Sequence, residues 1–112
     1  MVECEPEVED WLTGLDEKAF SRVSFYVDLL ARYGPLHGEP YTRQLDGKLR
    51  ELRFWLADRP TRISYWIAPG RRIILLTRWT KARMRETAEV ERARRAMRQC
   101  QMLRHTVDEE EW

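Results

Sequence analysis

Residues 49–79 read LRELRFWLADRPTRISYWIAPGRRIILLTRW, and this stretch decides the fold. Apolar and polar residues alternate in three runs, which is the pattern of a half-buried β-strand. The predicted strands cover residues 50–56, 61–67 and 72–79, and the last is continuously aliphatic in its first half, as in a strand buried on both faces. Turn residues, among them Pro and Gly, separate the runs, so the strands are predicted to form an antiparallel meander.

Helical periodicity returns on both sides of these strands. Before them, one helix is predicted from Pro6 and a second from Asp16 to Gly34, each with apolar residues three or four positions apart. After them, a third helix is predicted from about Met84. Its apolar stripe comprises Val90, Ala93, Met97 and Cys100. The sequence therefore predicts one α+β domain over residues 1–112, with two N-terminal helices, an antiparallel sheet of three to four strands and a C-terminal helix.

Three shorter segments complete this prediction. Residues 2–5 could form a short extended segment ahead of the first helix. The Gly- and Pro-containing stretch 34–40 is predicted to be a loop. The acidic segment from Asp108 to Glu111 is expected to fray from the end of the last helix.

Charge is distributed unevenly along the chain. The 112 residues carry 20 Lys and Arg against 19 Asp and Glu, which gives a formal net charge of +1. Residues 1–42 hold 3 basic and 9 acidic side chains, residues 43–104 hold 17 basic and 6 acidic ones, and residues 105–112 hold 4 acidic ones. Arginine supplies 15 of the 17 cations in the middle block, and its planar guanidinium group suits bidentate contacts to phosphate. This segregation indicates a polyanionic partner.

Several classes of protein are excluded by composition. The longest aliphatic run, Ile73–Leu76, is far too short to span a membrane, and the acidic N-terminus lacks the apolar core of a signal peptide. Cys4 and Cys100 are far apart and, with His37 and His105, form no metal-ligand pattern. We therefore expect a reduced, cytoplasmic protein with no membrane contact, no bound metal and no cofactor.

Candidate site residues lie on the polar positions of the predicted strands. Glu51, Arg53 and Arg62 share one face if both strands turn their apolar residues to the same side. Further cations and aromatic rings follow in or after these strands: Arg50, Arg78, Lys81, Arg83, Arg85, Trp55, Trp66 and Trp79. Cations interleaved with rings suit an RNA groove, because they bind phosphates and unpaired bases. The alternatives are a solvated polar face and tryptophans that pack under the last helix.

Such a face could cleave RNA without a metal, because the RNA 2′-hydroxyl can attack its own phosphate. Arg53, Arg62 and Lys81 suit the stabilisation of the pentacoordinate phosphate. Glu51 could accept a proton, although a carboxylate beside arginines is more often part of an ion pair. His105 could donate one if the end of the last helix folds over the sheet, and otherwise it is an exposed histidine without a role. The RNA-binding positions are Arg50, Arg78, Arg83, Arg85, Trp55 and Trp66.

A series of short motifs runs through the chain in a fixed order. They are the loop Tyr33–Leu36 with Pro40, the strand motifs Leu45–Arg53 and Arg62–Tyr65, the run Ile73–Leu76 with Trp79 and Lys81, and the helix opening Thr87–Arg95. Spread over roughly residues 6–100, this ordered set resembles the RelE/ParE superfamily of toxins, in its HigB-like branch related to phage Gp49.

The resemblance implies the toxin of a type II toxin–antitoxin system with the family's α+β fold. HigB- and RelE-like members cut mRNA on the ribosome without a metal, so we expect a ribosome-dependent mRNA endoribonuclease that inhibits translation. The implied partners are a cognate antitoxin with a helix-turn-helix domain, the ribosome with its mRNA, and operator DNA through the antitoxin complex only. The family's catalytic basic positions fall on Arg53, Arg62 and Lys81, whereas Ala82 stands where the family often has a second Lys.

Two other functions remain open. ParE-like members share the fold but inhibit DNA gyrase, so the chain could be a binder and not an enzyme. A non-catalytic nucleic-acid-binding module would show salt-dependent binding without toxicity or cleavage.

Overall fold

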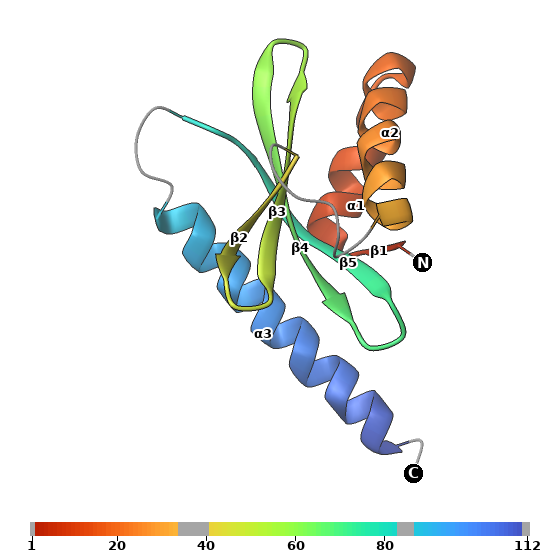
Figure 1. Ribbon diagram of the computed structural model, residues 1–112, viewed down its shortest axis with the longest axis vertical. Coiled ribbons are helices and arrows are strands. Elements are labelled where there is room, and N and C mark those ends of the chain that lie inside the picture. The colour runs from red at the N-terminus through yellow and green to blue at the C-terminus, as the bar shows by residue number, and fades with distance from the viewer. Residues whose placement is uncertain (1, 34–40, 83–86, 111–112) are drawn as a thin grey trace.

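A single sheet with helices on both faces forms the protein (Figure 1). The computed structural model describes residues 2–33, 41–82 and 87–110, with residues 104–110 described by their backbone alone. The elements in chain order are β1 (Val2–Cys4), α1 (Pro6–Thr13), α2 (Glu17–Tyr33), β2 (Thr42–Asp46), β3 (Leu49–Leu56), β4 (Arg59–Ala68), β5 (Arg72–Thr80) and α3 (Thr87–Glu110).

The sheet is mixed and has five strands in the order β1-β5-β4-β3-β2. Strands β2 to β5 form the antiparallel meander that the sequence predicts. The predicted number of three to four strands and the purely antiparallel pairing are wrong, because β1 pairs in parallel with β5, from Val2 opposite Ile73 to Cys4 opposite Leu75. Three residues are too few to show an alternating pattern, so the sequence could indicate only an extended segment here.

Both N-terminal helices start at the residues that the sequence indicates. Pro6 is the first residue of α1, and the backbone N–H of Gly14 closes its end by donating to the Trp11 carbonyl at 3.1 Å. The side chain of Asp16 caps α2, because its Oδ1 accepts a hydrogen bond of 2.7 Å from the Ala19 N–H. The two helices are therefore separate, joined by a short turn.

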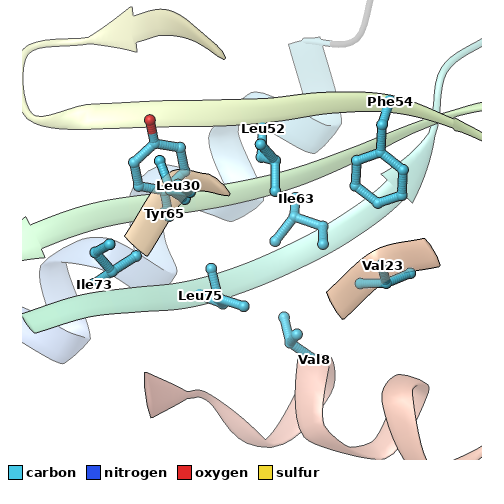
Figure 2. Packing of buried hydrophobic residues seen from close by; sticks show 9 residues of the cluster. All are labelled: Val8, Val23, Leu30, Leu52, Phe54, Ile63, Tyr65, Ile73 and Leu75. Atoms are coloured by element: carbon cyan, nitrogen blue, oxygen red, sulfur yellow. The ribbon is translucent and has the colours of Figure 1, made fainter. Parts of the chain in front are cut away.

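Helices α1 and α2 cover one face of the sheet. Figure 2 shows the buried residues between them and the strands: Val8, Val23, Leu30, Leu52, Phe54, Ile63, Tyr65, Ile73 and Leu75. On β3, β4 and β5 these residues occupy alternate positions, so the predicted apolar face of the sheet is confirmed.

Helix α3 crosses the opposite face. Its Ala93 and Cys100 are buried against Leu49, Trp66 and Ile74, which form a second core. Because helices cover both faces, the aliphatic run in β5 is buried throughout. This second face is therefore apolar only where α3 lies across it.

The C-terminal end of α3 extends beyond the sheet (Figure 1). The helix continues to Glu110, so the segment expected to fray from Asp108 onward is helical as far as that residue. None of the helices within the described ranges has the length and apolar character required to cross a membrane.

Candidate functional site

Helix α3 covers one face of the sheet. On this face the side chains change from apolar to polar toward the β3–β4 hairpin. Cross-strand pairing aligns Arg43, Glu51, Ser64 and Thr77 in one row and Arg53, Arg62 and Trp79 in the next. Residues paired in register on antiparallel strands point to the same side of the sheet. The exposed Lys81 follows the end of β5, and its N–H donates to the Pro60 carbonyl at 2.8 Å, one residue pair beyond Thr61 and Thr80. We call Arg43, Glu51, Arg53, Arg62 and Lys81 the cationic face.

Glu51 lies between two arginines of this face. Its Oε1 is 3.8 Å from Arg53 Nε and 3.9 Å from Arg62 Nε. The side chains of Glu51 and Arg62 are 5% and 8% exposed, whereas that of Arg53 is 27% exposed. The carboxylate therefore holds both guanidinium groups from the buried side and leaves Arg53 accessible from solvent.

The two arginines face each other directly across β3 and β4. Like charges in this position repel, and Glu51 lies within ion-pair distance of both groups. An oxyanion bound in front of the accessible Arg53 would accept charge-assisted hydrogen bonds from its guanidinium group and would also be attracted by the charge of Arg62. The geometry therefore suits a phosphate group.

Strand alternation predicted this cluster correctly, since Glu51, Arg53 and Arg62 lie together on one face. Lys81 lies beside them in the pairing pattern, as the sequence indicated. Trp55 belongs to the same part of the sheet, opposite Pro60, and is 59% exposed, so its ring is accessible to a ligand.

Arg78 lies on the other face, in contrast to the prediction. The pairing of β4 with β5 shifts at Ser64 and Tyr65, which face Thr77 and Leu75, so one residue of β5 is extra. A bulge of this kind reverses the alternation beyond it. The Arg78 guanidinium consequently lies over the Trp11 ring of α1, 5.3 Å from its centroid.

Two other predicted RNA-binding residues are also elsewhere. Arg50 lies on the α1–α2 side of the sheet, where its Nε donates to the Tyr65 hydroxyl at 3.3 Å and its Nη2 to Thr42 Oγ1 at 3.3 Å. Trp66 is buried under α3 and its indole N–H donates to Cys100 Sγ at 3.4 Å. Trp66 is therefore a core residue under the last helix, which was the alternative that the sequence left open for the tryptophans.

His105 is far from the cationic face. The part of α3 around Arg92 lies near the cationic face, since Arg92 Nη2 donates to the carbonyl of Arg78, the residue before Trp79. His105 is 13 positions further along the same continuous helix, or roughly 20 Å at 1.5 Å per residue. The end of α3 does not fold back over the sheet (Figure 1). The side chain of His105, like Arg83 and Arg85, is outside the described residues, so its role as an acid stays a prediction.

Arg43 is a site residue that the sequence reading missed. It lies in β2 directly opposite Glu51 and is exposed. The β2 sequence, Thr-Arg-Gln-Leu-Asp, shows weak alternation, and the only available signal was its position just before the first clear strand.

An ionic network anchors the start of α3 beside the cationic face. Arg92 contacts both Glu7 of α1 and Glu89 of its own helix, and Glu7 Oε2 accepts a 3.0 Å bond from the Arg78 N–H. Burial alone would lower the pKa of Arg92, but the hydrogen bonds to Glu89 and Glu7 outweigh it and raise this pKa. The position of α3 on the sheet is thus fixed by charge as well as by its apolar stripe.

Neither cysteine is placed for nucleophilic chemistry. Burial, together with the charges of Glu9 and Glu5, raises the pKa of the Cys4 thiol and disfavours the reactive thiolate. Cys100 is buried against Trp66. Within the described parts of the chain, no three His, Cys, Asp or Glu side chains are grouped so that they could hold a metal ion.

Comparisons with known proteins identify a family and a fold. The family described as "Phage derived protein Gp49-like" matches residues 10–99. A search of curated protein sequences gave no significant match.

Two solved structures share the architecture. One chain of the intact E. coli RelBE toxin–antitoxin complex aligns with a TM-score of 0.56 and 7% identity, over 74% of this chain and 98% of that one. One chain of the archaeal RelE–RelB complex from Pyrococcus horikoshii OT3 aligns with a TM-score of 0.56 and 24% identity, over 74% of this chain and 96% of that one. At these identities the likeness shows the RelE-like fold.

Proposed function

Because the chain belongs to the Gp49-like family, within the RelE/ParE toxin superfamily, we propose that it is the toxin of a toxin–antitoxin pair. We further propose that it cuts mRNA on the ribosome and so stops translation. Both structural relatives come from complexes, one of a toxin with its antitoxin and one of RelE with RelB, which supports an antitoxin as partner. The site of action is then the cytoplasm, where ribosomes and mRNA are found.

The observation that carries the nuclease proposal is the Arg53–Arg62 pair backed by Glu51. Two guanidinium groups directly opposite each other form a preorganised site for a phosphate that gains negative charge during the reaction.

The reaction is a transfer within the RNA. The 2′-oxygen attacks the neighbouring phosphorus, the P–O5′ bond breaks, and a 2′,3′-cyclic phosphate and a free 5′-hydroxyl result. The proton of the 2′-hydroxyl leaves to a base or to water, and the departing O5′ gains one. Arg53 and Arg62 stabilise the pentacoordinate phosphate throughout, because guanidinium groups remain charged.

Lys81 is the proposed proton donor to the departing oxygen. It is exposed beside Pro60, one residue pair beyond the arginines, and an ammonium group can release a proton. Glu51 is the proposed positioning residue, since it is buried behind both arginines and holds their guanidinium groups. The ribosome would present the mRNA, so free RNA is expected to be a poor substrate.

Controlled expression in bacteria tests this proposal. Wild-type protein is expected to stop growth, while Arg62→Ala and Arg53→Ala are expected to lower mRNA cleavage by about 10²–10³-fold, the usual effect of removing one group that stabilises transition-state charge. Arg71→Ala is the matched control, because it removes an exposed arginine from the β4–β5 turn at the other end of the sheet. Tolerance of wild-type protein at high levels, or full cleavage by both site variants with folding shown by circular dichroism, contradicts the proposal.

A further inference from the structure

A hollow lies beside the cationic face, at the edge of the sheet. Strand β2 pairs with β3 only as far as Leu52, and the N–H of Arg53 then donates to the Tyr41 carbonyl at 2.7 Å. Beyond this point β3 borders an open hollow of about 320 Å³. The residues that line it include the aromatic residues Tyr26, Tyr41, Phe54 and Trp55 and the cations Arg53 and Arg62.

The hollow has a rigid aromatic floor and accessible walls. The rings of Tyr26 and Phe54 stack with their centroids 4.9 Å apart and their planes 14° from parallel, and Phe54 is buried. Tyr41 is tilted toward Tyr26, at 6.0 Å between centroids. Tyr41 and Trp55 are 41% and 59% exposed, so both offer ring surface to a ligand.

An arginine of helix α2, Arg22, lies beside this hollow. Arg22 Nε donates to the Trp55 carbonyl at 2.5 Å, and its Cζ lies 5.6 Å from the Tyr26 ring centroid. The arginine therefore ties β3 to α2 at the position where Trp55 is displayed. It also adds positive charge beside the rings.

We propose that this hollow binds one unpaired nucleobase of the RNA whose phosphate lies against Arg53 and Arg62. The inference rests on the proposed RNA substrate and assigns a recognition subsite to it. Arg53 and Arg62 belong both to the cationic face and to the lining of the hollow. One ligand that occupies both must therefore combine a flat ring with an attached anion, and a nucleotide does.

Size and chemistry agree with a single base. Ligand pockets usually measure about 300–1,000 Å³, so a hollow of about 320 Å³ suits a group of the size of one base. Unpaired RNA bases are commonly held by stacking on aromatic rings and guanidinium planes. Trp55 and Tyr41 then contribute to the choice of the nucleotide next to the cleaved bond.

Binding of an uncleavable RNA tests the subsite without relying on catalysis. The probe is a fluorescent pentaribonucleotide with 2′-O-methyl groups, and a series of the same probe carries one abasic position each. For wild type, one abasic position is expected to weaken binding by about tenfold, within the range for loss of one stacked base. In Trp55→Ala the complete probe is expected to bind about tenfold more weakly, and that abasic position is expected to cause no further loss.

The control variant is Phe20→Ala, which removes an aromatic ring of α2 that is 47% exposed and does not line the hollow. It is expected to bind like wild type, and Tyr41→Ala is expected to behave like Trp55→Ala. Equal wild-type affinity for all abasic probes overturns the proposal, as does undiminished binding by both Trp55→Ala and Tyr41→Ala. Weakened binding of the antitoxin with unchanged RNA binding would likewise assign the hollow to a protein partner.

This result is separable from the proposed function. Base-dependent binding together with intact cellular mRNA would support the hollow and contradict the nuclease. Cleavage of mRNA with base-independent binding would support the nuclease and overturn the hollow.

Discussion

Arg62 is a buried, charged residue at a fixed position in the pairing of β3 with β4. It is almost inaccessible to solvent, shares Glu51 with Arg53, and lies directly opposite Arg53 across the strands. A buried charge is retained only when it is paired and hydrogen-bonded, and Nη1 of Arg62 also donates to the Thr61 carbonyl at 3.2 Å. The protein thus holds a charged group in a fixed orientation, as preorganised stabilisation of a reacting phosphate requires.

Replacement of Glu51 by Gln separates positioning from proton transfer. Glu51→Gln removes the charge that holds both arginines, so the cleavage rate is expected to fall by about tenfold or more through less precise positioning. If Glu51 only positions, the pH profile of cleavage is expected to keep its wild-type shape, because no titrating base is lost. The measurement is cleavage of ribosome-bound mRNA as a function of pH.

The same pH profile would also show whether Glu51 is the general base. Disappearance of the acidic limb of the profile in Glu51→Gln would identify Glu51 as the general base and contradict the positioning role. Glu91→Gln is a suitable control, since that carboxylate pairs with Arg94 on the surface of α3.

At the residue scale, the sequence predicts side-chain faces well where strands are regular. Glu51, Arg53 and Arg62 were grouped correctly because β3 and β4 pair without interruption between them. Arg78 was misplaced because an extra residue in β5 reverses the alternation, and an alternating pattern cannot reveal a bulge before pairing is known. For Trp66 the sequence left two alternatives open, an RNA-binding ring and a core ring under the last helix, because its surroundings come from α3, far along the chain.

At the scale of elements, the β3–β4 hairpin has an unfavourable turn. Leu56 pairs with Arg59, and the two residues between them, Ala57 and Asp58, have φ values of 49° and 62°. Two positive φ angles in a two-residue loop define a turn that favours Asn or Gly, and Ala is costly there. This turn connects β3 and β4, the two strands that carry Arg53 and Arg62.

Relief of this strain is expected to stabilise the protein. Ala57→Gly is expected to raise the free energy of unfolding by about 0.5–1 kcal/mol, because Gly adopts positive φ without steric cost. The reverse change, Gly47→Ala in the β2–β3 turn at φ 56°, is expected to lower it by about 1 kcal/mol, and no atom lies within 4 Å of the added Cβ. Urea denaturation of both variants measures the two effects, and a destabilised Ala57→Gly would contradict this assignment.

The elements themselves were largely predictable. All three helices and the central strands have clear periodicity, and Asp16 caps α2 as its residue type suggests. Strands β1 and β2 were harder to predict from the sequence. Strand β1 has only three residues, and it pairs in parallel with β5, which is far along the chain. The face of the sheet on which α3 packs could not be predicted either, because it depends on contacts between residues far apart in the chain, such as that of Arg92 with Glu7.

At the scale of the whole molecule, the acidic N-terminal helices and most of the cations belong to different parts of the fold. Helices α1 and α2 come from the acidic block of residues 1–42, whereas the cationic face and α3 come mainly from the basic block of residues 43–104. A net charge of +1 therefore conceals a sided distribution. Such a field orients an approaching polyanion toward the cationic face.

RNA binding is accordingly expected to depend strongly on salt. If Arg53, Arg62 and Lys81 each neutralise one phosphate, the slope of log K against log salt is about −2 for single-stranded RNA, or roughly 20-fold weaker binding at 200 mM than at 50 mM salt. Lys81→Gln is expected to reduce the magnitude of this slope by about 0.7. Binding measured by anisotropy at several salt concentrations checks this, and an affinity independent of salt would contradict it.

The most direct test of the central claim is sequencing of mRNA 5′ ends shortly after induction of the protein. Wild type is expected to produce new 5′ ends within translated codons, and Arg62→Ala is expected to produce none above background, while Arg71→Ala resembles wild type. Growth arrest with unchanged mRNA ends and a DNA-damage response would contradict mRNA cleavage and indicate gyrase as the target.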